Sequence, residues 1–145
     1  MSDKASVTEA IKGSDTVFLV TNYWESAKYD VEFGQGKNVA DAAKEAGVQH
    51  LIFSSLLQVG KLTNGRLSHV PHFEAKADIE EYIRKSGVPS SFYMPGYFMS
   101  NFDQTVQKGE DGSLSLAFPV GQNAKFPLID VAEDTGKSPQ ARTVK

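Results

Sequence analysis

The stretch TVFLVT at residues 16–21 decides the fold of this chain. It is a continuous apolar run rich in β-branched side chains, a pattern typical of a strand that is buried on both faces of a parallel sheet. Two further runs follow, HLIFSS at residues 50–55 and the weaker SSFYM at residues 90–94. The sequence therefore predicts a core of three strands.

Helical patterns separate these three strands. They cover residues 29–46 and 72–85, and Gly47 and Gly87 follow them closely. A glycine just beyond the last helical turn is a common stop signal. Strands that alternate with helices imply right-handed crossovers, so we predict a Rossmann-type parallel α/β sheet with flanking helices.

Two segments near the predicted core carry weaker signals. Ser6 and Glu9 have capping-box spacing, which predicts a short helix over residues 6–13. Residues 56–71 contain glycines, an asparagine and a proline, and we expect a loop there. A loop of this length in a compact domain is usually functional or mobile.

The last third of the chain changes character. Short strands are predicted at residues 114–118 and 126–131, and a helix is expected to start near Asp134. The polar C-terminal end has no stop signal. We therefore divide the chain into a domain, residues 1–136, and a disordered tail, residues 137–145.

Composition excludes several functions for this chain of 145 residues. The net charge of −3 provides no basic footprint, so we expect no direct nucleic-acid binding. Without cysteine, and with three histidines that lack acidic partners at ligand spacing, no metal site is predicted. No apolar run reaches the roughly 18–20 residues of a membrane helix, and from the polar start MSDK we expect no leader peptide. We expect the protein in the cytoplasm, with the nucleus as the alternative.

Four segments follow one another along the chain: VTNYWE at residues 20–25, GQGKNVADAAK at 34–44, VPHFEAK at 70–76 and PGYFMSNF at 95–102. In order and spacing they resemble the NmrA-like family, which consists of atypical relatives of the short-chain dehydrogenases. The resemblance implies that residues 1–136 are a partial NAD(P)-binding domain. The resemblance implies NADP(H) as cofactor and a role as redox sensor or transcriptional co-regulator. It also implies protein partners, either a transcription factor or a second copy of the chain.

The sequence departs from the family pattern at its beginning and end. The family starts with a strand, a glycine-rich turn and a helix whose N-terminus binds the pyrophosphate. Here Gly34 and Gly36 do not directly follow a strand, and the third glycine is missing, so they cannot replace that turn. The family also continues beyond Gly136. We interpret the chain as a truncated form with weakened cofactor binding and an open strand edge that invites self-association.

Three candidate cofactor-binding residues follow the first strand. Thr21, Asn22 and Tyr23 come just after its carboxyl end, where open α/β sheets bind ligands. The resemblance places them against the dinucleotide; the alternative is an ordinary turn. Trp24, the only tryptophan, either lies exposed beside the crevice or packs under the next loop.

Further cofactor contacts are implied by the resemblance alone. It assigns them to Lys44 on the first long helix, to Lys76 at the nicotinamide ribose, and to Tyr97, Phe98 and Asn101 at the nicotinamide end. For Lys44 a plain surface lysine is the alternative, and for Lys76 a solvated helix lysine.

The resemblance makes His72 and Lys76 the candidate catalytic pair. In active dehydrogenases of this superfamily, a tyrosine that donates the proton stands four residues before the lysine. Here that position holds His72. A neighbouring ammonium lowers the pKa of a histidine from its ordinary value of about 6.5, so His72 is expected to be neutral and a poor proton donor. The alternative for His72 is a packing residue. The resemblance places Ser54 and Ser55 about where the superfamily's catalytic serine would lie, although Ser-Ser is also common at strand ends.

Three functions remain open at this point. The chain is an NADP(H)-binding regulator, an NADPH-dependent reductase resembling isoflavone and quinone reductases, or a remnant that does neither. His72 favours the regulator over the reductase, whereas the absent glycine turn favours the remnant.

Overall fold

The computed structural model describes residues 1–118, 120–121, 123–125 and 127–137. The chain forms two compact units, Met1–Met94 and Pro95–Lys145. No helix within the described ranges is long and apolar enough to cross a membrane.

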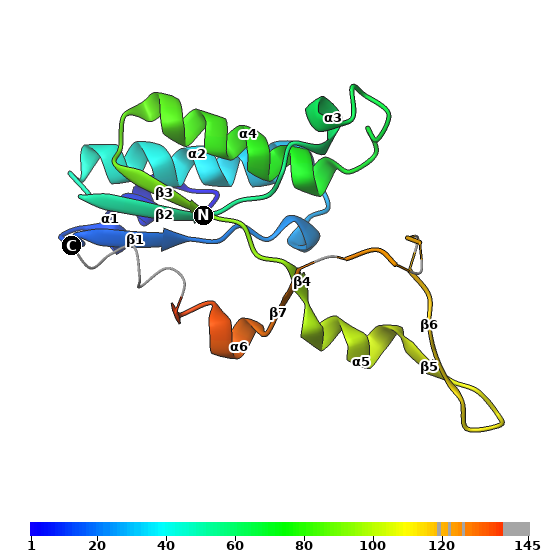
Figure 1. Ribbon diagram of the computed structural model, residues 1–145. Coiled ribbons are helices and arrows are strands. Elements are labelled where there is room, and N and C mark those ends of the chain that lie inside the picture. The colour runs from blue at the N-terminus through cyan, green and yellow to red at the C-terminus, as the bar shows by residue number, and fades with distance from the viewer. Residues whose placement is uncertain (119, 122, 126, 138–145) are drawn as a thin grey trace. The chain divides into compact units, whose positions relative to one another are not determined.

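The first unit contains the predicted sheet. Its strands are β1 (Thr16–Leu19), β2 (His50–Ser54) and β3 (Ser90–Tyr93), in the order β1-β2-β3. Both pairings are parallel, as Figure 1 shows, with Thr16 opposite His50. The prediction of three parallel strands in a Rossmann-type sheet is confirmed.

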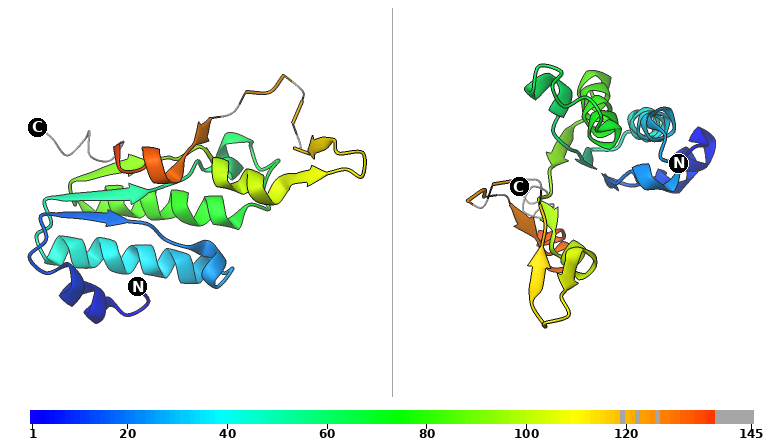
Figure 2. Two further views of the ribbon diagram at one scale, coloured as in Figure 1. Left: turned by 90° about the horizontal axis from the view of Figure 1, so that it is seen from below. Right: turned by 90° about the vertical axis from the view of Figure 1, so that its right-hand side faces the viewer.

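Two long helices connect the strands and form the other layer. α2 (Tyr29–Glu45) and α4 (Pro71–Ser86) lie side by side on one face of the sheet (Figure 2), and α1 (Lys4–Ile11) packs against α2. Both long helices end as predicted, because Gly47 and Gly87 take positive φ angles of 70° and 82°. The core between the layers includes the fully buried side chains of Leu51, Phe53, Ile79 and Ile83.

The expectation that the first strand is buried on both faces is wrong. Val17 and Leu19 pack into the core below the helices, but Phe18 and Val20 keep 44% and 52% of their surface exposed. Successive side chains of a strand point to opposite faces, and the helices that connect these strands all lie on one face. Within the first unit, the apolar run is therefore covered on one side only (Figure 2).

The first helix begins earlier than predicted. α1 starts at Lys4, and its N-cap is Asp3, whose carboxylate accepts hydrogen bonds from the backbone N–H groups of Ala5 (3.2 Å) and Ser6 (3.1 Å). Ser6 lies inside the helix instead of capping it. Asp3 is the better N-cap because its backbone is extended and its two carboxylate oxygens accept hydrogen bonds from two otherwise unpaired N–H groups of the first turn.

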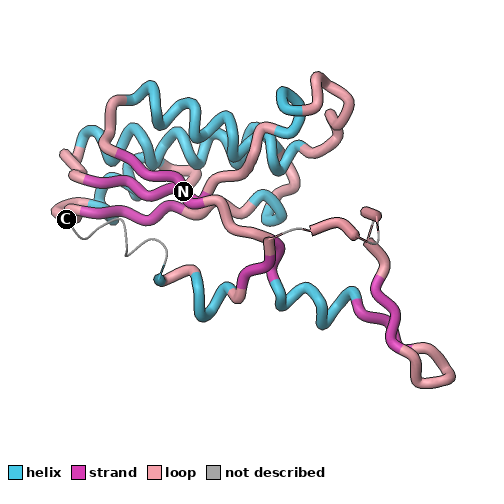
Figure 3. Tube along the Cα trace, viewed as in Figure 1, coloured by secondary structure: helices cyan, strands magenta, loops and turns pink. Residues whose placement is uncertain are grey.

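The segment 56–71 is not the plain loop that we expected. It contains a short helix, α3 (Val59–Leu62), visible as a cyan turn in Figure 3. The Glu74 carboxylate accepts a hydrogen bond from the Gly60 N–H at 2.7 Å, and Asp78 accepts one from the Gln58 amide at 2.9 Å. Both acceptors belong to α4, so the segment is tied to that helix.

Gly36 explains how closely the two long helices approach each other. A Cβ atom built on Gly36 would lie 2.6 Å from two side-chain carbons of Ile79 on α4, whereas one on Gly34 would meet nothing within 4 Å. Gly36 thus lies inside α2 at a helix–helix contact, and neither glycine forms a phosphate-binding turn. This agrees with the interpretation that the pair does not replace the missing motif.

The second unit consists of short elements. β4 (Tyr97–Phe98) pairs parallel with β7 (Leu128–Ile129), and β5 (Val106–Lys108) pairs antiparallel with β6 (Leu114–Leu116). η2 (Met99–Asn101) and α5 (Phe102–Thr105) follow β4. The predicted strand at residues 114–118 is confirmed in part, as β6.

The end of the chain differs from the prediction. β7 lies within the strand predicted at 126–131, of which residue 126 is outside the described residues. The last helix, α6 (Val131–Asp134), ends at Asp134 instead of starting there, because Asp130 caps it through the N–H groups of Ala132 and Glu133. The predicted tail lies, from residue 138 onward, outside the described residues.

Candidate functional site

The carboxyl end of β1 leads directly into the candidate site. Thr21 and Tyr23 are buried, with 3% and 8% of their surface exposed, whereas Asn22 is exposed. Asn22 caps the short helix η1 (Tyr23–Glu25) by accepting a hydrogen bond from the Trp24 N–H at 3.2 Å. The three predicted cofactor residues therefore lie beyond the strand end, where such sheets bind ligands.

Lys76 reaches this strand end from α4. Its ammonium donates hydrogen bonds to the backbone oxygen of Thr21 at 2.6 Å and to the Thr21 hydroxyl at 2.7 Å. A third contact, at 2.8 Å, joins it to the Glu32 carboxylate. Only 14% of the Lys76 side chain is exposed, so the alternative of a solvated helix lysine is wrong.

Glu32, on α2, is the residue that sequence reasoning missed. Its side chain is fully buried, and Oε1 accepts hydrogen bonds from both Lys76 and the Thr21 hydroxyl, the latter at 2.7 Å. Oε2 is buried without a hydrogen-bond partner among the described residues. A signal existed: Glu32, Gly36, Val39 and Ala43 share one helical stripe, where a carboxylate is out of place unless it is paired.

His72 lies among aromatic rings at the start of α4. Its ring centroid is 5.1 Å from that of Trp24, 5.8 Å from Tyr23 and 4.9 Å from Phe73. Burial is the largest cause that lowers the pKa of His72; Glu32 opposes the shift and Lys76 adds to it. The direction agrees with the prediction, but the main cause is burial instead of the lysine.

Trp24 is exposed and not packed under the following loop. It keeps 70% of its surface accessible, and the Tyr23 ring meets it edge-on at 5.2 Å. The alternative of core packing is therefore wrong. As the only tryptophan, it reports on its immediate surroundings.

The other predicted site residues lie elsewhere. Lys44 is exposed near the end of α2, twelve residues after Glu32, which corresponds to about 18 Å along the helix. The structure does not bring it to Lys76. Tyr97, Phe98 and Asn101 belong to the second unit, where the Tyr97 ring packs against that of Phe102 at 5.6 Å. Their contacts with a cofactor stay predictions.

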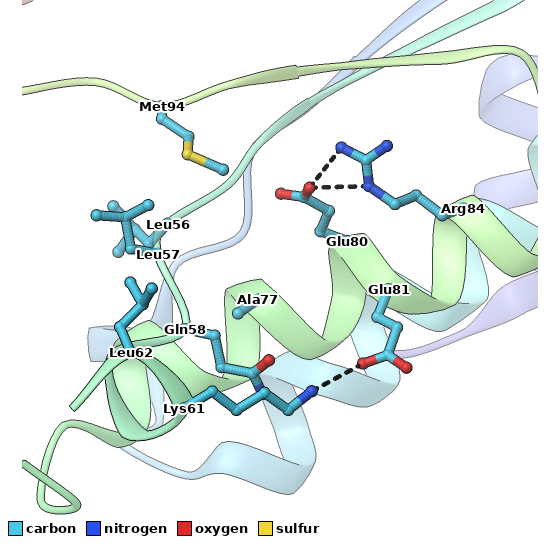
Figure 4. A pocket seen from close by; sticks show the side chains of 10 residues that line it. All are labelled: Leu56, Leu57, Gln58, Lys61, Leu62, Ala77, Glu80, Glu81, Arg84 and Met94. Carbon is cyan, nitrogen blue, oxygen red and sulfur yellow. Dashed lines mark hydrogen bonds and ion pairs between the residues drawn. The ribbon is translucent and has the colours of Figure 1, made fainter. Parts of the chain in front are cut away.

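A shallow groove opens beside α4, and sequence reasoning did not find it. It lies between α4 and the segment that follows β2 (Figure 4). Its volume is about 360 Å³. Apolar side chains of Leu56, Leu57, Leu62 and Met94 line it, and Glu80 pairs with Arg84 at its border at 2.7 Å.

Ser55 is fully buried, and its hydroxyl contacts the Leu56 backbone oxygen at 3.4 Å. Within the described ranges no three acidic, histidine or cysteine residues are placed to hold a metal ion.

The parallel order β1-β2-β3, with helices that connect successive strands, is that of a Rossmann-type α/β fold. The family model of the NmrA-like family matches residues 1–141. The chain therefore belongs to the NmrA-like family.

Two relatives and two solved structures illustrate the similarity. The NmrA-like family domain-containing oxidoreductase malD of Malbranchea aurantiaca is 35% identical over 92% of this chain and 44% of its own length. The nitrogen metabolite repression protein nmr of Neurospora crassa is 30% identical over 91% of this chain and 27% of its own length. The chain thus spans less than half the length of these curated relatives.

The crystal structure of NmrA, a negative transcriptional regulator, matches with a TM-score of 0.81 and 26% identity, over 95% of this chain and 43% of that one. A quinone oxidoreductase from Escherichia coli, solved with NADPH, matches with a TM-score of 0.56 and 22% identity. The match covers 72% of this chain and 33% of the quinone oxidoreductase, and at 22% identity it supports the fold alone.

Proposed function

We propose that this chain is the nicotinamide-facing part of an NADP(H)-binding regulator. Two similar proteins are described as regulators, the nmr protein of Neurospora crassa and NmrA. A protein of the same fold was solved with NADPH. The regulatory role would act through protein partners, in the cytoplasm or nucleus. The net charge of −3 gives no sign of direct nucleic-acid binding.

The observation that carries this proposal is the position of His72 beside Lys76 and the end of β1. A lysine at the strand end suits the binding of a sugar hydroxyl, whereas a neutral imidazole at the proton-donor position suits catalysis poorly. Burial lowers the pKa of His72, which favours the neutral imidazole, a poor proton donor in catalysis. The cofactor-binding residue of this pair, Lys76, is thus kept, while its catalytic partner is weakened.

The residues present fit the nicotinamide side of the cofactor. Thr21, Asn22, Tyr23 and Lys76 would hold that end, where a bound cofactor supplies hydride chemistry. The sequence has no glycine-rich turn after a strand for the pyrophosphate. Charge-assisted hydrogen bonds contribute about 1.5–3 kcal/mol each, so without several of them we expect NADP(H) to bind no tighter than about millimolar, roughly −4 kcal/mol.

The test is saturation-transfer NMR of the chain with NADPH over a millimolar concentration range. We expect saturation of the nicotinamide and adjacent ribose protons but not of the adenine protons. Asn22→Ala should reduce this transfer, whereas Asn123→Ala, at an exposed asparagine of the second unit, should not. Micromolar NADPH binding, or contact through the adenine, would contradict the proposal. A complete absence of saturation transfer would contradict it too and favour a remnant that does not bind the cofactor.

A reductase is the second candidate function, because the Malbranchea aurantiaca relative is described as an oxidoreductase. NADPH consumption with a panel of quinones and enals separates the two. Saturable turnover by the chain would favour the reductase over the regulator.

A further inference from the structure

The Lys76 ammonium is fully engaged by groups of the chain itself. An ammonium has three N–H donors. The structure supplies three acceptors, at 2.6 Å (Thr21 backbone oxygen), 2.7 Å (Thr21 hydroxyl) and 2.8 Å (Glu32 Oε1). A ligand that bonds to Lys76 must therefore share or displace one of these partners.

The network joins three elements of the first unit. Glu32 comes from α2, Lys76 from α4 and Thr21 from the end of β1. The Glu32 side chain has no exposed surface, and a buried carboxylate is tolerated only when it is paired. Among the ion pairs of the described residues, Lys76 is the only cationic partner of Glu32. Each of the two charges therefore holds the other in place.

We propose that Glu32 is the positioning residue of this site: it holds the Lys76 ammonium at the strand end and neutralises its charge, so that Lys76 accepts a neutral hydroxyl ligand and rejects an anion. The ligand preference rests on the proposed cofactor function, whereas the positioning role does not. A phosphate or carboxylate beside Lys76 would also lie near the buried carboxylate of Glu32, and like charges repel. A sugar hydroxyl carries no such charge and can replace the Thr21 hydroxyl as hydrogen-bond partner.

Reductive methylation with formaldehyde, followed by peptide mass spectrometry, measures how accessible each lysine is. In the unmodified chain we expect Lys76 to react about tenfold more slowly than the exposed Lys44, because it reacts only after a local opening. Glu32→Gln removes the charge and keeps the shape, and it should raise the Lys76 rate about tenfold. Lys44 should stay unchanged, which excludes global unfolding as the cause.

A matched control and a phosphate arm sharpen the test. Glu45→Gln removes an exposed carboxylate of the same helix, the partner of Lys4, and should leave the Lys76 rate unchanged. Inorganic phosphate should slow the labelling of Lys76 in Glu32→Gln but not in the unmodified chain. Equal rates for Lys76 and Lys44 in the unmodified chain, or a Lys76 rate indifferent to Glu32→Gln, would overturn the positioning role.

A variant that fails to fold still decides the question. If Glu32→Gln unfolds the chain, adding Lys76→Met removes the second buried charge and should restore cooperative unfolding. A double variant that remains unfolded would contradict the pairing. NADPH binding is measured separately, so its absence removes the ligand preference and leaves the labelling result standing.

Discussion

Gly36 and Gly34 offer a matched pair for testing how α2 and α4 pack. Both lie inside α2, but a Cβ on Gly36 would come within 2.6–2.7 Å of three side-chain carbons of Ile79, whereas one on Gly34 would meet nothing within 4 Å. Ile79 is fully buried and β-branched, so it has little freedom to move aside. Alanine should therefore have opposite effects at the two positions.

The magnitudes follow from two opposing contributions. Alanine in place of glycine stabilises a helix interior by about 1 kcal/mol. Overpacking a core costs about 1–3 kcal/mol, and contacts this short place Gly36→Ala at the upper end. We expect Gly36→Ala to lower the free energy of unfolding by ~2 kcal/mol and Gly34→Ala to raise it by up to ~1 kcal/mol, a separation of about a hundredfold in the unfolding constant.

Urea unfolding followed by far-ultraviolet circular dichroism measures both variants. Ile79→Ala relieves the clash at the expense of a cavity, so its combination with Gly36→Ala should lose less stability than the sum of the single changes. Equal stability of Gly36→Ala and Gly34→Ala, or strict additivity with Ile79→Ala, would refute the close helix contact.

Four further outcomes are expected. Trp24 emission should change as pH falls through a midpoint below 6.5, because burial lowers the pKa of the adjacent His72, and the transition should vanish in His72→Gln. Since the fold favours neutral His72, stability should also fall as pH drops below 6.5, and a flat profile would contradict this. Burial and the hydrogen bond to Asp78 raise the pKa of Tyr29 to about 12, so one phenolate should appear only near that pH; Tyr29→Phe should remove it and cost about 1 kcal/mol. Turnover of NADPH with quinones and enals should be absent or very slow, and a saturable rate would show otherwise.

The sequence predicted the strands and long helices of the first unit because each carries a local pattern. Residues 16–21 and 50–55 are apolar runs, and both long helices end at glycines that take positive φ angles. The end of β1 and Lys76 were also found as candidate site residues, and the structure brings Thr21 and Lys76 together. Periodicity and stop signals depend only on neighbours along the chain, so they are readable without the fold.

The missed features depend on contacts between distant segments. Glu32 becomes a site residue only because Lys76, 44 residues later, reaches it across the two helices. α3 has four residues, too few for a helical period, and the Glu74 carboxylate of α4 supports its first turn. The exposure of Phe18 depends on which face the helices cover, a matter that an apolar run alone does not decide.

The parallel sheet also has a consequence for the rate of folding. Thr16 pairs with His50 and Leu51 with Ser90, so the partners are 34 and 39 residues apart along the chain. Each pairing must close a long loop, with its entropic cost, before any interstrand hydrogen bond compensates for it. α2 and α4 involve local contacts and form within about a microsecond, whereas the strands wait for both helices to dock. The first unit should accordingly refold more slowly than a helical bundle of equal length, with helical content appearing before the sheet.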